Sequence, residues 1–195
     1  TQPGAIVPRE TGGFAMAAED GFSTLDDAGM IMDSLGDPQA GQGDTRFNDG
    51  KVAPDGSFYA GTMAYDATRP IAALYRLTAD GDIQRLVDGV IISNGLAWRD
   101  GLFYYIDSPT REIRRFRIEE GRPVAPEPCF ALGSQFPDAV PDGMTIDAEG
   151  RLWVALWNGA AVIAVDPDKG EVESQISLPC PHVTSCCFGG DALDT

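Results

Sequence analysis

The sequence predicts an all-β propeller, because one local pattern recurs along the chain at the spacing of propeller blades. The pattern is an acidic residue and a glycine followed by an aromatic, β-rich segment, and its copies begin at Asp55, Asp100 and Glu149. Consecutive copies lie roughly 45 to 50 positions apart, which is the period of repeats that each form one four-stranded blade. A further turn at 189–191 arrives too close to the last residue for another strand to follow.

Each repeat also has a second half that reads as a β-hairpin. Short alternating segments are joined there by tight acidic-Gly turns, which is the pattern of antiparallel strands. These segments are residues 73–77, 113–118 and 162–165. Because no segment carries a sustained helical period with caps, we expect little helix. We also expect Phe58, Tyr104 and Trp153 at corresponding places in successive blades.

The composition is that of a soluble globular domain with an acidic surface. The 195 residues carry a formal net charge of −16, which repels nucleic acid and argues against nucleic-acid partners. No apolar run approaches the ~20 residues that cross a bilayer, and residues 1–20 lack a signal-peptide pattern. We therefore expect a cytoplasmic protein with no membrane partner. Export stays open if the true N-terminus is missing, and the oligomeric state is also open.

The cysteines and the histidine argue against a disulfide framework, a zinc knuckle and a serine triad. Four cysteines, two of them adjacent at 186–187, do not form the pattern of a secreted disulfide scaffold. Cys180 and Cys186 lack the pairwise spacing of a zinc knuckle, so we expect buried, reduced thiols. His182 is the only histidine, and no Ser-His pair is evident near a nucleophile elbow.

Three polar residues occupy similar places directly before predicted strands. Asn48, Asn94 and Asp142 are each followed at once by glycine or Asp-Gly and then by an apolar strand. Equivalent places in a propeller face the same axial mouth, and Arg46 lies beside the first of them. Amide and carboxylate oxygens near an arginine suit a divalent cation together with a polar, hydroxylated ligand. Asn-Gly and Asp-Gly are also ordinary turn dipeptides, so these residues alone leave a turn and a site both open.

Five motifs follow one another in chain order at 46–51, 58–63, 93–96, 141–144 and 184–190. They read Arg-Phe-Asn-Asp-Gly-Lys, Phe-Tyr-Ala-Gly-Thr-Met, Ser-Asn-Gly-Leu, Pro-Asp-Gly-Met and Thr-Ser-Cys-Cys-Phe-Gly-Gly. In these motifs the chain resembles the family of regucalcin (senescence marker protein), gluconolactonases and related sugar lactonases. The resemblance implies a six-bladed propeller that holds one divalent metal at its axial mouth and hydrolyses sugar lactones.

The resemblance also implies roles for individual residues. Asn94 and Asp142 match two metal ligands of the family, and Asp142 is the expected catalytic base that takes a proton from the attacking water. Arg46 and Asn48 match residues that contact the sugar. Asp66 stands where the family often has a substrate-contacting glutamate. Oxygen ligands of this kind suit Ca²⁺, Mg²⁺ or Mn²⁺ and are also compatible with Zn²⁺, so the identity of the metal is open.

Two departures from the family imply that this chain is partial. The remaining metal ligand of the family is a glutamate in its first blade, whereas Glu10 and Glu19 lie in a segment that resembles the second blade. The family also continues beyond Gly190 into a strand that helps to close the ring. We therefore expect residues 1–195 to be one partial propeller domain of about four blades, without the first blade and the end of the last. The full-length parent is the candidate lactonase, and we do not expect this fragment to be fully active by itself.

Two other functions fit the same residues. A propeller can bind a divalent metal or a sugar without catalysis, because a fold does not fix chemistry. Hydrolysis of another ester class, such as phosphotriesters or thiolactones, would use similar metal chemistry. The chain has all four of the polar residues Arg46, Asn48, Asn94 and Asp142. Their presence together favours an enzyme, because a pure scaffold needs none of them.

Overall fold

In a computed structural model of the chain, which describes residues 2–193 and 195, the regular structure is almost entirely β-strand. The described residues form sixteen strands and one short 3-10 helix, η1 (Ser108–Thr110). They divide into two compact units, Thr1–Ser93 and Asn94–Thr195. The predicted low helix content is confirmed, and no helix in the described part of the chain is long and apolar enough to cross a membrane.

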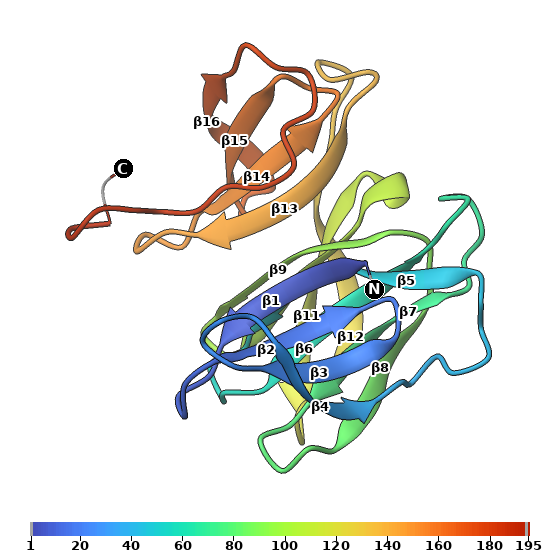
Figure 1. Ribbon diagram of the computed structural model, residues 1–195. Helices are drawn as coiled ribbons and strands as arrows, with labels where there is room; N and C mark the ends of the chain where they lie inside the picture. The colour runs from blue at the N-terminus through green and yellow to red at the C-terminus, as the bar shows by residue number, and fades with distance from the viewer. Residues whose placement is uncertain (1, 194) are drawn as a thin grey trace. The chain divides into compact units, whose positions relative to one another are not determined.

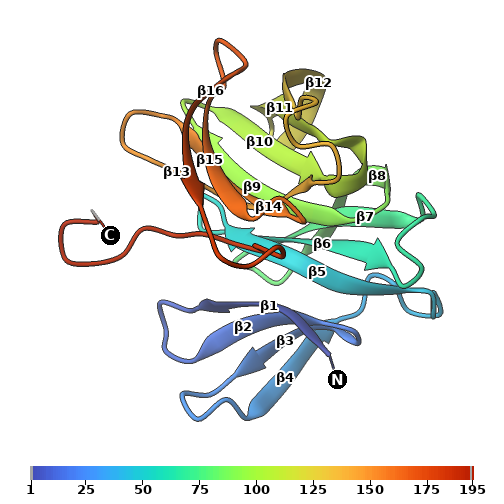
Figure 2. The same cartoon turned by 90° about the horizontal axis from the view of Figure 1, so that it is seen from above.

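The first unit consists of two four-stranded antiparallel sheets in which the strands follow chain order (Figure 1, blue to green). The strands of its first sheet are β1 (Pro3–Pro8), β2 (Phe14–Ala18), β3 (Gly21–Leu25) and β4 (Ile31–Gly36). Those of its second sheet are β5 (Thr45–Val52), β6 (Phe58–Ala64), β7 (Ala72–Leu77) and β8 (Ile83–Val90). Figure 2 shows the two sheets of this unit lying face to face. A four-stranded sheet of consecutive strands is the arrangement of a propeller blade.

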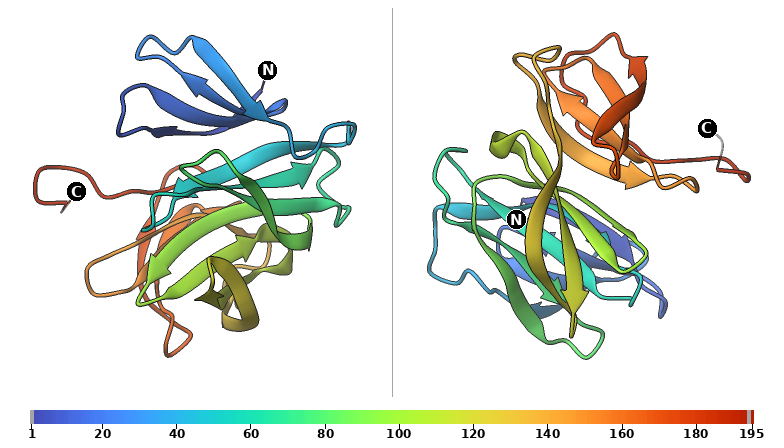
Figure 3. Two further views of the ribbon diagram at one scale, coloured as in Figure 1. Left: turned by 90° about the horizontal axis from the view of Figure 1, so that it is seen from below. Right: turned by 180° about the vertical axis from the view of Figure 1, so that it is seen from behind.

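The second unit repeats this arrangement, with its two sheets again in chain order (Figure 3). The strands of the earlier sheet are β9 (Ser93–Arg99), β10 (Leu102–Asp107), β11 (Glu112–Glu119) and β12 (Arg122–Ala131), and Ser93 is also the last residue of the first unit. Those of the later sheet are β13 (Val140–Ile146), β14 (Leu152–Trp157), β15 (Ala161–Asp166) and β16 (Glu171–Ser177).

The recurrent acidic-Gly pairs form the tight turns that lead into the second strand of three sheets. Gly56, Gly101 and Gly150 have φ values of +82°, +78° and +86°, a region that glycine enters without steric cost. Asp100 also has a positive φ of +52°, so its turn has the two left-handed residues that favour a right-twisted hairpin. The repeat seen in the sequence is therefore a repeated hairpin turn.

Each unit has its own core between its two sheets. In the first unit, the ring centroid of Phe22 on β3 lies 4.8 Å from that of Phe47 on β5 and 5.8 Å from that of Phe58 on β6. Aromatic pairs of this kind add about 0.5–1.5 kcal/mol each beyond the burial of their area. The core of the second unit is mainly aliphatic, and Ile106 of β10 and Leu156 of β14 are fully buried in it.

One predicted correspondence between the repeats is wrong by a single residue. Phe58 is paired with Val52 at the start of β6, and Leu152 is paired with Ile146 at the start of β14, so Phe58 corresponds to Leu152. Trp153 therefore corresponds to Tyr59, not to Phe58. Because side chains alternate between the two faces of a strand, the shift matters. Phe58 and Leu152 both enter a core cluster between two sheets, whereas Trp153 packs against a separate cluster.

The cysteines depart in part from the prediction. All four are free thiols, as expected for reduced cysteines. Cys129 and Cys186 are half-buried, but Cys180 and Cys187 are exposed, so the predicted burial is wrong for these two. Both exposed residues follow β16, in the segment after the last strand of the later sheet.

The all-β prediction is confirmed, and the four sheets of four consecutive antiparallel strands are those expected of propeller blades. The number of blades in the whole protein, the partial status of the chain and its organisation as a single domain stay predictions.

Candidate functional site

A β-bulge interrupts the pairing of β5 with β6 at the first predicted site. Phe47 is paired with Thr62 and Gly50 with Ala60, so three steps along β5 match two steps along β6. Asn48 lies in this bulge. A bulge bends its strand and redirects side chains, which is why bulges are common beside active sites.

The same bulge occurs in β13 at the third predicted site. Pro141 is paired with Leu156 and Met144 with Val154, so again three steps match two. The pairing gives Asp142 the place in β13 that Asn48 has in β5, as the spacing in the sequence indicates. These two residues are equivalent because each is the first residue of a bulge with the same register.

The first strand of the first sheet has the corresponding bulge, with Gly4 in the equivalent place. Its pairing changes register between Pro3 and Ala5. A Cβ atom on Gly4 would lie 2.5 Å from the backbone carbon and 2.6 Å from the backbone oxygen of Phe47. Such distances are far below ordinary carbon contacts, so β1 can offer no side chain at this place.

Arg46 and Asn48 contact each other within the first unit. The Arg46 guanidinium donates to the backbone oxygen of Phe47 at 2.9 Å and to Oδ1 of Asn48 at 3.3 Å. The Asn48 amide nitrogen donates to the backbone oxygen of Ser93 at 2.9 Å. Both residues are half-buried, so the hydrogen-bonded pair stays partly exposed.

Asp49, the other residue of the β5 bulge, carries a perturbed carboxyl group that the sequence did not single out. Burial raises the pKa of Asp49, while the hydrogen bond from the Gly50 backbone N–H and the charge of Lys51 act in the opposite direction. The Gly50 nitrogen lies 2.8 Å from Oδ1 of Asp49. In β13 the equivalent residue is Gly143, which has no side chain.

Asn94 and the backbone before Asp142 are joined through Ser108 in the second unit. The Asn94 amide nitrogen donates to Oγ of Ser108 at 2.8 Å, and that hydroxyl donates to the backbone oxygen of Pro141 at 2.6 Å. Asn94 is 5% exposed and Ser108 2% exposed. Ser108 was not among the predicted site residues. The only signal for it in the sequence is a small polar residue directly after the second strand of a repeat.

Glycine is required directly after Asp142, because another segment of the chain passes close by. The Gly143 N–H donates to the backbone oxygen of Thr184 at 2.9 Å. A Cβ on Gly143 would lie 2.7 Å from that oxygen and 3.0 Å from Cα of Ser185. Asp142 itself is half-buried at this crowded point of β13.

The loop that leads into β13 is held by Arg111. Its guanidinium donates to the backbone oxygens of Phe136 at 2.8 Å and Pro137 at 3.1 Å, and also to that of Ala139. Arg111 itself has a left-handed φ of +59° at the end of η1. These contacts fix the chain shortly before Asp142, and sequence reasoning did not find them because the residues concerned lie 25 to 28 positions apart.

Asp66 lies in an exposed turn, where its carboxylate is occupied by local donors. Oδ1 accepts from the Thr68 backbone N–H at 2.9 Å, and Oδ2 forms an ion pair with Arg69. These interactions hold the pKa of Asp66 below its usual value. The hydrogen bond from the Thr68 backbone is the largest cause, and that from the Arg69 side chain is the next. Arg69 also binds Asp44 at 2.9 Å. A role for Asp66 in substrate binding stays a prediction.

Asn94 and Asp142 have side chains of the types that a hard divalent cation accepts as ligands. In the part of the chain that the structure describes, no group of three or more His, Cys, Asp or Glu side chains could hold a metal ion. The predicted ligands differ from such a group, because one of them is a neutral amide. Amide and carboxylate oxygens are the ligands that Ca²⁺ and Mg²⁺ accept. If Asn94 and Asp142 both bind one cation, its other coordination positions would be taken by water, substrate or a further carboxylate.

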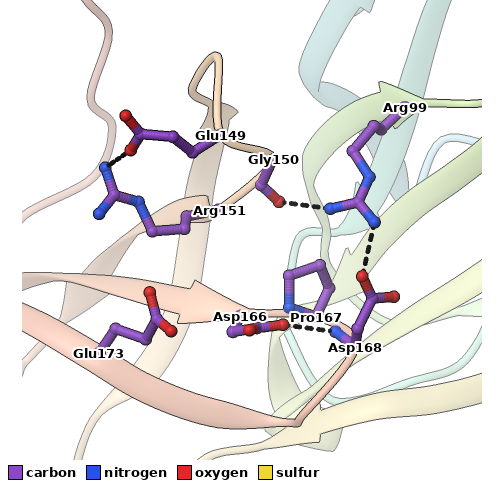
Figure 4. A pocket seen from close by; sticks show the side chains of 8 residues that line it. All are labelled: Arg99, Glu149, Gly150, Arg151, Asp166, Pro167, Asp168 and Glu173. Carbon is purple, nitrogen blue, oxygen red and sulfur yellow. Dashed lines mark hydrogen bonds and ion pairs between the residues drawn. The ribbon is translucent and has the colours of Figure 1, made fainter.

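A charged cavity lies at the opposite end of the strands from Asp142. It has a volume of about 330 Å³ and is lined by Arg99, Glu149, Gly150, Arg151, Asp166, Pro167, Asp168 and Glu173 (Figure 4). Arg99 binds the Gly150 backbone oxygen at 3.0 Å and Asp168 at 2.7 Å. Asp142 is the third residue of β13, whereas Gly150 belongs to the turn after that strand. The cavity is therefore separate from the predicted site, and its charges are engaged in bonds that link neighbouring turns.

The structure thus brings the predicted residues together as two pairs. Arg46 contacts Asn48 in one unit, and Asn94 is linked to the backbone that precedes Asp142 in the other. Convergence of the two pairs at one mouth stays a prediction.

Known proteins are similar to this chain in sequence and in fold. The sequence model described as SMP-30/Gluconolactonase/LRE-like region matches residues 1–195. Regucalcin from Danio rerio is 39% identical over 193 residues, covering 96% of this chain and 64% of that protein. YvrE from Bacillus subtilis (strain 168), whose name assigns it provisionally as a sugar lactone lactonase, is 39% identical over 184 residues, covering 92% of this chain and 62% of that protein.

A solved structure of luciferin-regenerating enzyme matches with a TM-score of 0.88 at 31% identity, covering 96% of this chain and 66% of that one. The chain spans 62% to 64% of the length of the two curated relatives named above. The match to the family extends over the whole chain and includes the motifs that carry both residue pairs. The chain therefore belongs to the SMP-30/gluconolactonase/LRE-like family.

Proposed function

We propose that the whole protein hydrolyses sugar lactones with the help of one divalent cation. The observation that carries this proposal is the link from Asn94 through Ser108 to the backbone before Asp142. It fixes one amide oxygen donor in relation to the strand that bears the carboxylate. A fixed pair of this kind suits a cation, because hard cations select oxygen ligands by number and geometry. Family membership supports the lactone as the substrate class.

Asn94 and Asp142 would hold the cation, and Asp142 would also act as the base. When bound, a divalent cation polarises the lactone carbonyl and stabilises the negative charge that develops on its oxygen. The Asp142 carboxylate accepts the proton of the water that attacks the carbonyl carbon. It then returns this proton to the ring oxygen as the C–O bond breaks. Each lactone ring that is opened consumes one water molecule.

Arg46 and Asn48 would orient the substrate. A guanidinium donates several hydrogen bonds in a fixed plane, and an amide both donates and accepts, so the pair suits a polyhydroxylated ring. Their mutual hydrogen bond holds both side chains before the substrate arrives, which lowers the entropic cost of orienting it. We propose a weaker contribution from Asp66, because its carboxylate is already engaged by Thr68 and Arg69.

A panel assay of the whole protein tests this proposal. The protein is stripped with a chelator and then assayed with Ca²⁺, Mg²⁺, Mn²⁺ or Zn²⁺ on sugar lactones, a thiolactone and a phosphotriester. We expect hydrolysis of sugar lactones that depends on the added cation. Saturable cation binding without hydrolysis of any ester would favour a binding protein. Hydrolysis confined to the thiolactone or phosphotriester would favour the other ester class.

A further inference from the structure

Ser108 lies at a junction between a strand and a short helix. It is the first residue of η1, which follows β10, and it is 2% exposed. The residue before η1, Asp107, makes no side-chain capping hydrogen bond. The Ser108 hydroxyl is directed instead to two groups that are distant in sequence. Asn94 lies 14 positions before it and Pro141 lies 33 positions after it.

The Ser108 hydroxyl can donate its hydrogen to only one of these two groups. The backbone oxygen of Pro141 cannot donate, so the contact of 2.6 Å requires Ser108 to donate to it. A hydroxyl has one hydrogen, and Ser108 must therefore accept in its contact of 2.8 Å with Asn94. The donor in that contact must be the Asn94 NH₂ group. This reasoning fixes the orientation of the Asn94 amide group.

The orientation of this amide decides whether Asn94 can bind a cation. A cation is bound by the carbonyl oxygen of an amide, and the NH₂ group would be repelled. With NH₂ held toward Ser108, Oδ1 is on the opposite side of the amide group and is the atom that would bind the cation. The same hydroxyl also anchors the backbone oxygen of Pro141, and this peptide unit leads directly into Asp142.

We propose that Ser108 is a positioning residue for the cation site. Its hydroxyl sets the amide orientation of Asn94 and fixes the start of the bulge that carries Asp142. The inference rests on the proposed function, because it assigns Ser108 a role through the two proposed ligands. Groups that orient metal ligands in this way commonly change metal affinity 10–100-fold when they are removed.

Substitution of Ser108 tests the proposal when it is compared with a matched control. Ser57 is also a buried serine, 3% exposed, and its hydroxyl accepts from Nε of Arg76 at 2.9 Å in the other unit. The whole protein is prepared unaltered, as Ser108→Ala and as Ser57→Ala. Mn²⁺ binding is measured by calorimetry, and the unfolding midpoint is measured with a chelator present.

We expect Ser108→Ala to raise the Mn²⁺ dissociation constant about 10–100-fold. Ser57→Ala should lower the unfolding midpoint without changing this constant. Ser108→Thr keeps the hydroxyl and should restore most of the affinity. Equal Mn²⁺ affinity of the unaltered protein and Ser108→Ala would overturn the inference and leave the proposed function standing. Absence of any Mn²⁺ binding by the unaltered protein would overturn both.

A measurement on the unaltered protein keeps the inference testable if Ser108→Ala does not fold. The side-chain NH₂ group of Asn94 can be followed by NMR during a titration with Ca²⁺. We expect its hydrogens to be protected from exchange before Ca²⁺ is added and to stay protected at saturation. Its carbonyl carbon should shift as the cation binds. Fast exchange of these hydrogens in the free protein would contradict the proposed contact.

Discussion

The bulge in β5 and the bulge in β13 share one register but carry different chemistry. In β5 the bulge holds Asn48 and Asp49, whereas in β13 it holds Asp142 and Gly143. The carboxylate thus occupies the second position in one bulge and the first position in the other. The fold supplies the same place twice, and the residue type at that place decides what it can do.

The surroundings of the two bulges also differ, because the second position of each bulge carries a different residue. Gly143 allows the backbone of Thr184 to approach β13 closely, and a side chain there would collide with it. Asp49 instead has a carboxyl group whose pKa is raised by burial. The bulge of β1 is the limiting case, because Gly4 offers no functional group at all. A bulge of this register can therefore serve as a site only if it carries a suitable side chain.

The largest effect is expected in the β13 bulge. Asp142→Asn should reduce lactone hydrolysis by the whole protein by ~10²–10⁴-fold, because it removes the base and an anionic ligand. The rate is measured at saturating cation. Asp138→Asn, which changes an exposed carboxylate in the loop before β13, serves as the control and should keep full activity. Activity of Asp142→Asn close to that of the control, with an unchanged far-UV spectrum, would rule out this role.

A smaller effect on substrate use is expected beside the β5 bulge. Arg46→Ala should lower kcat/KM by roughly 10–100-fold, mostly through KM, because hydrogen bonds to a charged group contribute about 1.5–3 kcal/mol. Cation affinity should not change. Arg117→Ala removes an arginine side chain that is 65% exposed and serves as the control. If Arg46→Ala instead weakens cation binding with KM unchanged, the two bulges do not have the separate roles assigned here.

The β1 bulge should respond only through stability. Gly4→Ala places a Cβ 2.5 Å from the Phe47 carbonyl carbon, so we expect a loss of about 1–3 kcal/mol in the free energy of unfolding. Gly43→Ala is the matched control, because its Cβ would meet nothing within 4 Å. Both are compared by urea denaturation. Equal stability of the two variants would show that β1 and β5 are not packed as described.

The smallest effect is expected from Asp49 and depends on pH. Burial raises its pKa in the folded protein, so folding favours the protonated carboxyl and disfavours the ionised one. The protein should therefore lose part of its stability as pH rises through the folded pKa of this group. Asp49→Asn should be more stable than the unaltered protein at pH 7, and this gain should disappear as pH falls below the usual range of an aspartate. A gain that is the same at both pH values would contradict the assignment.

The repeat could be predicted from the sequence because its turns and strands are local. Gly56, Gly101 and Gly150 mark the hairpins, and the equivalence of Asn48 and Asp142 follows from their spacing. The bulges could not be predicted, because an extra residue in a strand is visible only in its pairing with a neighbour. The prediction placed Phe58 level with Trp153, whereas the strand pairing makes Leu152 its equivalent.

The contacts that fix the site could not be predicted either, because they join residues far apart in the chain. Ser108 reaches Asn94 and Pro141 only after β9, β10 and β13 have come together. Arg111 holds the loop before β13 through backbone oxygens, and any residue type can offer these. Every residue has a backbone oxygen, so the sequence does not show which residue accepts such a hydrogen bond.

A cation located in crystals of the whole protein would test the central claim most directly. Crystals grown with Mn²⁺ would be examined for an anomalous scattering peak. The account predicts one ion bound by Oδ1 of Asn94 and the Asp142 carboxylate, at about 2.0–2.6 Å from each oxygen. It also predicts that the Asn94 NH₂ group still faces Ser108. An ion bound elsewhere, with Asn94 and Asp142 both outside its coordination sphere, would contradict the account.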